Sequence, residues 1–270
     1  VRREALLAQM VEGRLQLALA ALEDDVGQDV TRVATRATPA GTTGEGWTLH
    51  GRKAVVPNGG LADWLFVSAA TAEGPALFAV PRAAPGVRLR PFRTNDGQNA
   101  AELVLDAVAV PREDRLDPAC GVPELLALAF DHASAALCFE VVGSSAWLLD
   151  ATCEYLKTRE QYGAPLAKFQ VLQHKLADMY VSLELARSMA HVAAAALDKA
   201  PPVRMREVSA ARLQAIRCAR LAGREAVQMH GGMGMSEELV VSAHFKRLTM
   251  TTLAFGDEPF HLARMAALSD

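Results

Sequence analysis

The sequence predicts an α+β protein in which a small β-barrel or β-sandwich domain precedes a C-terminal up-and-down four-helix bundle. Between residues 47 and 108 the apolar runs are short and are separated by Gly and Pro, as in all-β domains. From Pro123 to the end of the chain, apolar residues recur with the helical period instead of the strand period. The helical segments are long and their connections are short, which favours antiparallel neighbours in a bundle.

The first part of the chain is expected to contain a helix, a strand and a turn. Residues 4–14 place their apolar side chains on one helical face, and the Leu- and Ala-rich residues 15–22 predict a strand. The sequence Gly27-Gln28-Asp29 predicts a turn that Asp29 braces with its carboxylate.

Short strands are expected through the β domain. We place a hairpin turn at His50-Gly51, and the break at residues 57–60 ends the strand after it. The expected strand segments are 47–53, 54–56, 64–68, 77–80 and 103–108.

Four long helices are expected after the β domain. Pro201-Pro202 separates the second helix from the third. The Ala-rich stripe between Met189 and Leu197 is interpreted as bundle core and not as a membrane surface. The expected helices cover residues 125–158, 170–199, 203–230 and 237–255.

Composition excludes several classes of protein. With 51% hydrophobic and 22% charged residues the chain is typical of globular proteins, not of disordered ones. A net charge of −3 gives no basic footprint for nucleic acid. Every window of eighteen residues contains at least one charged residue, and no signal-peptide pattern is present. We therefore expect a cytoplasmic protein without a membrane span. The scattered Cys120, Cys138, Cys153 and Cys218 predict buried thiols, neither a metal site nor disulfides.

The stretch from Arg159 to Leu166 joins two amphipathic segments through a tight turn. Gly163 and Pro165 break the first helix, and the helical period resumes at Leu172. An Arg offers a planar fork for phosphate oxygens, and a Tyr offers a flat face to a ring. A structural alternative is a helix hairpin in which the Arg caps the preceding helix. The candidates for contacting one ligand are Arg159, Gln161, Tyr162 and Gln170.

A second stretch, from Gln228 to Gly234, has three glycines within four residues after a long helix. Such a loop lets backbone N–H groups approach an anion or a purine edge. Alone, it is more typical of a helix C-cap. The two stretches, in this order and about seventy residues apart, resemble the acyl-CoA dehydrogenase family, and the resemblance covers nearly the whole chain.

This resemblance implies a cofactor and a domain organisation. In that family, the two motifs bind the ADP half of FAD across a subunit interface. Family members also carry an N-terminal helical domain over the substrate's acyl chain, of which only the last helix fits before residue 15. We therefore expect a remnant of it at 1–14, a β domain at 15–118 and the bundle at 119–270. The implied cofactor-binding residues are Arg159, Gln161, Tyr162, Gln170, Gln228, Gly231 and Gly232.

The family reaction needs a carboxylate base, and this sequence lacks one where the family has it. The usual Glu of a Tyr-Glu-Gly-Thr segment is replaced by Phe255, next to Gly256. The other family position falls near Ala133, where the Arg that usually follows is Ser134. We therefore assign no catalytic residue. The alternative bases are Asp257 and Glu258 first and Asp131 second, and His132, His174, His230 and His261 are expected to be packed or capping side chains.

The flavin-facing motifs depart from the family as well. Leu22 and Gln28 stand where the family has Thr and Ser, and Val55-Val56-Pro57 stands where it has Trp-x-Thr. Proline has no N–H to offer a flavin ring. The resemblance therefore predicts that this chain's own flavin pocket is degenerate.

The flavin-facing motifs depart from the family pattern, whereas the ADP-binding motifs match it. This combination favours a non-catalytic subunit of a heteromeric acyl-CoA dehydrogenase. We expect an α2β2 assembly with a homologous catalytic subunit, an acyl-CoA substrate in the partner's pocket and an electron-transfer acceptor. By analogy alone, the substrate would be bulky, as in steroid side-chain degradation. The alternatives are an active homo-oligomer with a displaced base, and a flavin-free scaffold on the same fold.

Overall fold

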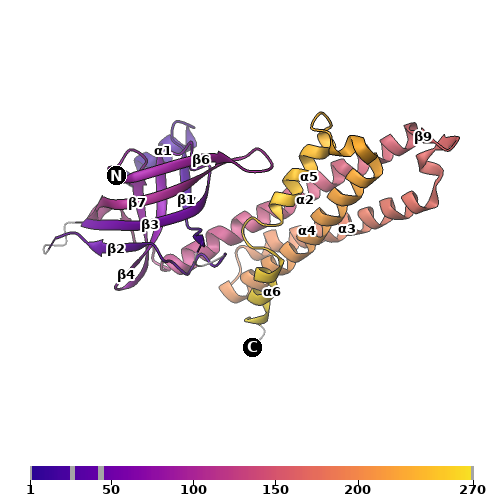
Figure 1. Cartoon of the computed structure of the whole chain (residues 1–270). Helices are drawn as coiled ribbons and strands as arrows, with labels where there is room; N and C mark the ends of the chain where they lie inside the picture. Colours follow the sequence, from indigo (N-terminus) through magenta and orange to yellow (C-terminus); the bar gives the residue numbers. More distant parts are fainter. Residues whose placement is uncertain (1, 25–27, 42–45, 269–270) are drawn as a thin grey trace. The chain divides into compact units, whose positions relative to one another are not determined.

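The computed structural model describes residues 2–24, 28–41 and 46–268. Residues 1–127 and 128–270 form two compact units. The first unit contains the sheet and the second contains the helical bundle (Figure 1), which is the α+β fold that the sequence predicts. Helix α2 (Val122–Thr158) begins in the first unit and continues through the second.

The first unit is built on one eight-stranded sheet in the order β6-β7-β3-β2-β4-β5-β8, with β1 paired to β4. The sheet is mixed, because β4 pairs in parallel with β1 and β2 while the other pairs are antiparallel. A short helix, α1 (Arg2–Val11), precedes it. The strands are β1 (Leu17–Ala20), β2 (Arg36–Pro39), β3 (Gly46–Pro57), β4 (Trp64–Thr71), β5 (Gly74–Pro81), β6 (Val87–Arg93), β7 (Asn99–Pro111) and β8 (Arg115–Leu116).

The predicted hairpin turn at His50-Gly51 is wrong. β3 is continuous there, and its register with β7 shifts between Leu49 and Gly51, as at a β-bulge. A Cβ on Gly51 would lie 2.6–2.8 Å from atoms of Thr35. The glycine therefore serves a close approach of two chain segments and not a turn.

The two longest strands of the sheet that the pattern did not indicate are β2 and β6. Neither alternates buried and exposed residues cleanly, since β2 has one buried residue and β6 has none. β6 is an edge strand with Arg88, Arg90 and Pro91, residues that discourage further pairing.

The predicted turn at residues 27–29 is described in part. Gly27 lies outside the described residues. Asp29 accepts hydrogen bonds from the backbone N–H of Thr31 at 3.0 Å and from its hydroxyl at 2.6 Å. This Asp therefore braces the local backbone, as predicted.

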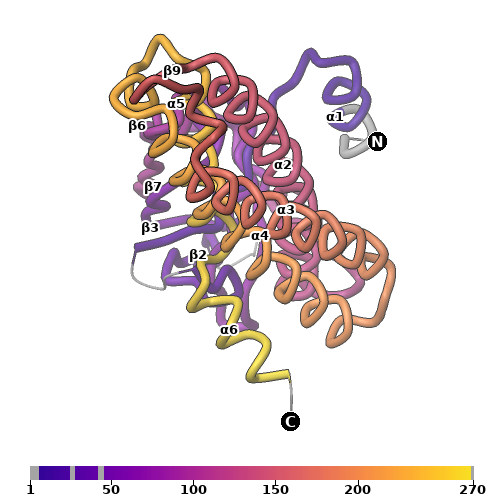
Figure 2. Tube along the Cα trace, turned by 90° about the vertical axis from the view of Figure 1, so that its right-hand side faces the viewer, coloured from indigo at the N-terminus to yellow at the C-terminus, as the bar shows by residue number. Residues whose placement is uncertain are grey.

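The second unit contains α2, α3 (Gln170–Ala196), α4 (Pro201–His230), α5 (Val240–Thr251) and α6 (Glu258–Ala266). α3 and α4 lie side by side over most of their length (Figures 1 and 2). The core draws Leu, Val and Ala side chains from α2, α3, α4 and α5, and it includes the Ala-rich stripe of α3. By length and composition alone α2 could cross a membrane; half of its most apolar window is buried in the structure.

The fourth predicted helix is too long at both ends. Gly231–Met235 form a short 3-10 helix, and α5 begins only at Val240. α5 ends at Thr251, whose hydroxyl donates back to the carbonyl of Leu248 at 2.7 Å. Phe255 then has a φ of 53°, a left-handed conformation that is incompatible with a right-handed α-helix.

Candidate functional site

The first motif forms a small hairpin at the end of α2. Strands β9 (Glu160–Gln161) and β10 (Ala164–Pro165) pair antiparallel, and Tyr162 and Gly163 form the two-residue loop with φ values of 56° and 78°. Two positive φ angles are typical of a type I′ turn. A Tyr in this conformation is uncommon and strained by about 1–3 kcal/mol. The turn holds the Tyr162 ring out from the bundle.

Two side chains of this hairpin are exposed at the surface, and the Tyr162 ring also meets Phe169 edge-on. Tyr162 is 91% exposed. Arg159 is also exposed, and its guanidinium makes no hydrogen bond or ion pair with any residue that the structure describes. The backbone of Arg159 closes the motif, since its N–H donates to the carbonyl of Tyr155 and its carbonyl accepts from Leu166, both at 2.8 Å. The structural alternative, an Arg that caps α2 with its side chain, is therefore not supported.

The second motif is the turn after α4. Gly231 ends the helix with a φ of 62°. A Cβ on Gly234 would lie 2.6 Å from the carbonyl oxygen of Val227, so packing within the chain explains that glycine. A Cβ on Gly232 would meet nothing within 4 Å, and its φ is ordinary. Neither packing nor backbone conformation in the described chain therefore explains a glycine at 232.

The two motifs meet through a pair of rings. Tyr155, one turn before Arg159, stacks on His230 with ring centroids 4.3 Å apart and an interplanar angle of 23°. His230 is buried, and its Nδ1 lies 2.8 Å from the carbonyl oxygen of Ala226. All seven predicted cofactor-binding residues are exposed; they are Arg159, Gln161, Tyr162, Gln170, Gln228, Gly231 and Gly232.

The alternative bases of the second unit are engaged in structural contacts. Asp257 is the N-cap of α6 and accepts from the N–H of Phe260 at 3.0 Å. Glu258 forms an ion pair with Arg220. Asp131 is fully buried and accepts from Arg204 at 2.8 Å and from another arginine, on α6, at 2.6 Å.

The turn at Phe255 is held by several contacts. Nη2 of Arg212 donates to the carbonyl oxygens of Thr251 and Ala254 at 2.7 and 3.0 Å. The carbonyl oxygen of Phe255 lies 3.2 Å from Nε2 of His261. The Phe255 ring packs edge-on against Phe130, with centroids 5.1 Å apart. The residue in the register of the family base is therefore an aromatic side chain in a well-supported turn.

The four histidines considered as candidates fall into two pairs. His230 and His261 are buried, as predicted, whereas His132 and His174 are exposed, so the packed interpretation is wrong for these two. Burial, reinforced by the nearby charge of Arg212, lowers the pKa of His261 to about 3. His261 is therefore neutral at physiological pH and acts as a hydrogen-bonding anchor.

The flavin-facing positions of the first unit lie together. Leu22 forms a β-bridge with Val55, and the N–H of Ala54 donates to the carbonyl of Leu22 at 3.0 Å. Val56 is in the core, whereas Val55 and Pro57 face outward. Two of the substituted positions, Leu22 and Val55, are therefore neighbours, and both carry apolar side chains.

The first unit also contains a buried polar network that the sequence pattern did not reveal. Lys53 is fully buried and lies 2.5 Å from Glu23 and 2.9 Å from the hydroxyl of Ser68. Glu23 also accepts from the hydroxyl of Thr35 at 2.6 Å. The one available signal was strand alternation, which puts Lys53 on the same inward face as Leu49.

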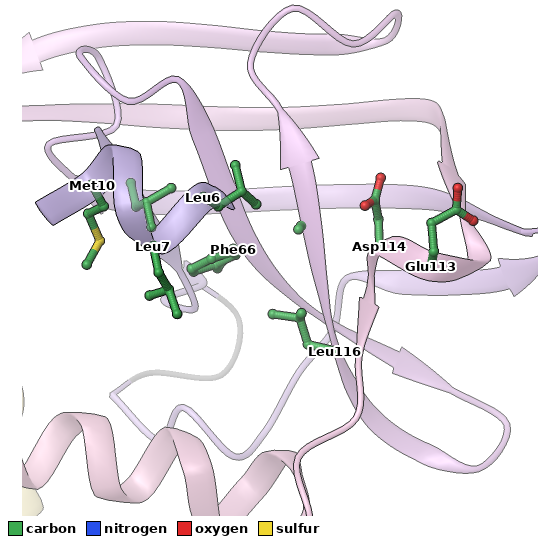
Figure 3. Close-up of a pocket in the computed structure, with 9 residues that line it drawn as sticks. Leu6, Leu7, Met10, Phe66, Glu113, Asp114 and Leu116 are labelled. Carbon is green, nitrogen blue, oxygen red and sulfur yellow. The ribbon is translucent and has the colours of Figure 1, made fainter. Parts of the chain in front are cut away.

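A cavity of about 300 Å³ in the first unit lies between α1 and the sheet (Figure 3). Its lining is mostly apolar, with Leu6, Leu7 and Phe66, and Glu113 and Asp114 lie at one side. None of the predicted cofactor-binding residues lines it. The cavity is therefore separate from the two motifs.

Comparison with known proteins gives the same assignment for both halves. The acyl-CoA dehydrogenase middle-domain model matches residues 18–108, and the C-terminal-domain model matches residues 124–268. The mitochondrial short-chain specific acyl-CoA dehydrogenase of Homo sapiens is 30% identical over 228 residues, covering 81% of this chain and 55% of that protein. The chain spans little more than half the length of such curated relatives.

Solved structures agree over the full chain. A variant of the Tcur3481-Tcur3483 steroid ACAD (acyl-CoA dehydrogenase) is 33% identical, with a TM-score of 0.87, covering 99% of this chain and 71% of that chain. A glutaryl-CoA dehydrogenase from Mycobacterium smegmatis in complex with FADH2 is 27% identical, with a TM-score of 0.91, covering 99% of this chain and 69% of that chain. From its β domain through its helical bundle, this chain belongs to the acyl-CoA dehydrogenase family, whose members bind FAD.

Proposed function

We propose that this chain is a subunit of a heteromeric acyl-CoA dehydrogenase that lends the ADP-binding edge of FAD to a homologous catalytic partner. The observation that carries the proposal is the exposed guanidinium of Arg159, which has no partner among the described residues, beside a glycine turn that is open at Gly232. The guanidinium charge of Arg159 and the open backbone at Gly232 belong to two motifs whose helix ends are in contact. This arrangement favours the binding of an external ligand.

The residues fit one half of FAD and not the other. Arg159 supplies the fork for the pyrophosphate, Tyr162 a ring face, and Gly231 and Gly232 accessible backbone N–H groups. The bridged side chains of Leu22 and Val55 have no hydroxyl to offer the flavin ring. We therefore assign the ADP half to this chain and the flavin ring to the partner.

The chemistry of the assembly follows from this division. The flavin, when bound, accepts the hydride from the β-carbon of an acyl-CoA thioester, and a carboxylate must remove the α-proton. In this chain Asp131, Asp257 and Glu258 hold helices in place, and Phe255 stands in the register of the family base. The base, the thioester pocket and the dry environment would therefore come from the partner.

The remaining features of the assembly are supported by analogy. The similarity to a steroid ACAD supports a bulky acyl-CoA substrate and a paired, α2β2 arrangement. An electron-transfer acceptor would reoxidise the flavin. We place the assembly in the cytoplasm, on the composition of the chain.

An active homo-oligomer with a displaced base is the second candidate. Its support is the location of Asp257 and Glu258 two and three residues after Phe255. A flavin-free scaffold is the third, and it requires that the Arg159 hairpin has no ligand.

Flavin stoichiometry separates the three candidates. The chain would be tagged in its own organism, and the purified assembly analysed for subunits by mass spectrometry and for FAD by absorbance after denaturation. We expect one FAD for every two chains and a homologous partner in equal amount. A yellow homo-oligomer with one FAD per chain would exclude the heteromeric proposal, and a colourless assembly would favour the scaffold.

A further inference from the structure

The Arg159 hairpin follows the end of α2 and the glycine turn follows the end of α4, and a contact between α2 and α4 joins these two helix ends. The clamp is defined as the hairpin 159–170 together with Gln228, Gly231 and Gly232. Arg159 follows α2, and the glycine turn follows α4, so the relative position of the two motifs depends on how these helix ends are held. The stack of Tyr155 on His230 lies at both ends at once.

We propose that the Tyr155–His230 stack is a positioning contact that sets the Arg159 hairpin against the glycine turn for the ADP half of FAD. This inference rests on the proposed function. It adds two residues that touch no part of the cofactor themselves and act through Arg159 and Gly232.

On the α2 side, Tyr155 is coupled directly to Arg159. Its carbonyl oxygen accepts the N–H of Arg159 at 2.8 Å and the hydroxyl of Thr158 at 3.1 Å. A shift of the Tyr155 ring therefore moves the last turn of α2 and the start of the hairpin with it.

On the α4 side, His230 is coupled directly to the glycine turn. It is the residue before Gly231, and its ring is fixed by the contact of Nδ1 with the carbonyl of Ala226. Its Cβ is also part of the wall against which Gly234 packs. Because His230 is buried, its ring has little freedom to reorient. The position of the ring therefore helps to fix the position of the glycine turn.

The ring of Tyr155, and not its hydroxyl, makes the contact. The hydroxyl has no hydrogen bond to any described residue. The bundle also provides a matched control: Trp147 of α2 stacks on His244 of α5 with centroids 4.4 Å apart and an angle of 19°. The two stacks have nearly the same geometry, but only the first adjoins clamp residues.

The test measures FAD affinity on the assembly stripped of FAD and titrated again, with thermal unfolding followed in parallel. Tyr155→Leu should weaken FAD binding by about three- to tenfold, as expected for the loss of an aromatic pair. Tyr155→Phe should bind like the parent. Trp147→Leu should lower the unfolding temperature by a similar amount as Tyr155→Leu and leave FAD affinity within about twofold.

A double-mutant cycle shows whether Tyr155 acts through Arg159. In the Arg159→Ala background, Tyr155→Leu should have no further effect on FAD affinity. An equal loss in both backgrounds, or an equal loss from Trp147→Leu, would overturn the positioning role. If Tyr155→Leu does not assemble, His230→Asn, which removes the ring from the other side, should give the same three- to tenfold loss.

The outcomes also separate this inference from the proposed function. If Arg159→Ala weakens FAD binding and Tyr155→Leu does not, the clamp stands and the stack is only a packing contact. If Arg159→Ala itself leaves FAD binding unchanged, the clamp is wrong and the positioning role fails with it.

Discussion

The carboxylate of Asp131 lies 2.8 Å from Nε of Arg204, and neither side chain is more than 5% exposed. Arg264 of α6 completes the cluster at 2.6 Å. Three helices, α2, α4 and α6, are thus tied by one buried carboxylate between two guanidinium groups. This arrangement holds the three helices together and keeps the Asp131 carboxylate fully buried.

Replacing Asp131 with Asn should therefore damage the fold. The buried Arg204 and the partly buried Arg264 would lose their counter-ion, at a cost of about 3–5 kcal/mol in the free energy of unfolding. Glu184→Gln, which removes an exposed ion pair with Arg187, should cost less than about 1 kcal/mol. Urea unfolding of both variants checks this. If Asp131→Asn were as stable as the parent but lost turnover, Asp131 would be a candidate base.

The Lys53–Glu23 pair should make stability depend on pH at the alkaline side. Burial lowers the pKa of Lys53 from 10.5 to about 8, although Glu23 partly opposes the shift. Between pH 8 and 10.5 the unfolded chain holds the proton on Lys53 more tightly than the folded chain does. The free energy of unfolding therefore rises with pH in this window, with a slope of up to about 1.4 kcal/mol per pH unit from this residue.

Urea unfolding from pH 7 to 10.5 measures this slope against a control, the double variant Lys53→Met/Glu23→Gln, in which both charges are absent. The parent should gain stability relative to the control as pH rises. A constant difference over the window would mean that Lys53 keeps its proton in the fold. On the acid side, burial alone would raise the pKa of Glu23, but its bonds from Lys53 and Thr35 hold it below 4.5. Its contribution is present above that pH and is lost as pH falls.

Local patterns predicted the fold class, while contacts between distant residues were beyond them. The change from strand period to helical period located the two halves because each period reflects burial along one segment. Gly51 misled the prediction, since a glycine needed for the close approach of Thr35 has the same signature as one needed for a turn. The edge strand β6 was missed because its side chains are not buried on either face.

The candidate site divides in the same way. The Arg159 hairpin and the glycine turn were found because each is a contiguous motif with its own turn chemistry. The stack of Tyr155 on His230 joins residues 75 positions apart, and the cluster at Asp131 joins residues 73 and 133 positions apart. Only the folded bundle brings these side chains together, so no spacing in the sequence indicates them.

Arg159→Ala should weaken FAD retention by the assembly without destabilising the bundle. The expected loss is about 1.5–3 kcal/mol, the usual contribution of a hydrogen bond to a charged group. Arg159→Lys should restore it only in part, because an ammonium lacks the planar fork. FAD dissociation after dilution measures the effect, with Arg187→Ala as a control for loss of an exposed arginine. Parent-like retention in both Arg159 variants would show that the motif is not a clamp.

Gly232→Ala and Gly231→Ala should separate ligand contact from backbone strain. A methyl at 232 meets no atom within 4 Å and its φ is ordinary, so the unfolding temperature should not fall. FAD binding should nevertheless weaken, because the methyl stands where the cofactor approaches. Gly231→Ala should lower stability by about 1 kcal/mol, since its φ of 62° is unfavourable for Ala. Unchanged FAD affinity in Gly232→Ala would place the cofactor elsewhere.

The last prediction concerns the base and separates the two leading functions. If this chain supplies no catalytic base, the turnover of assemblies carrying Asp257→Asn or Glu258→Gln should stay within a few-fold of that of the parent assembly. Asp257→Asn should remove the carboxylate without destabilising α6, because Asn is as good an N-cap as Asp and should keep the hydrogen bond to the N–H of Phe260. The ion pair of Glu258 with Arg220 is partly exposed, so its loss should cost less than about 1 kcal/mol.

A true α-proton base contributes at least about 10²–10⁴-fold to the rate, so its amide would lose that factor. The assay is acyl-CoA dehydrogenation with an artificial electron acceptor, run with FAD content checked in each variant. A drop of more than a hundredfold with FAD still bound would place the base on this chain and favour the active homo-oligomer. Phe255→Glu should not create activity, since Leu22 and Val55 would still offer the flavin ring no polar partner. Restoring a carboxylate in the register of the family base would then supply a base with no oriented flavin beside it.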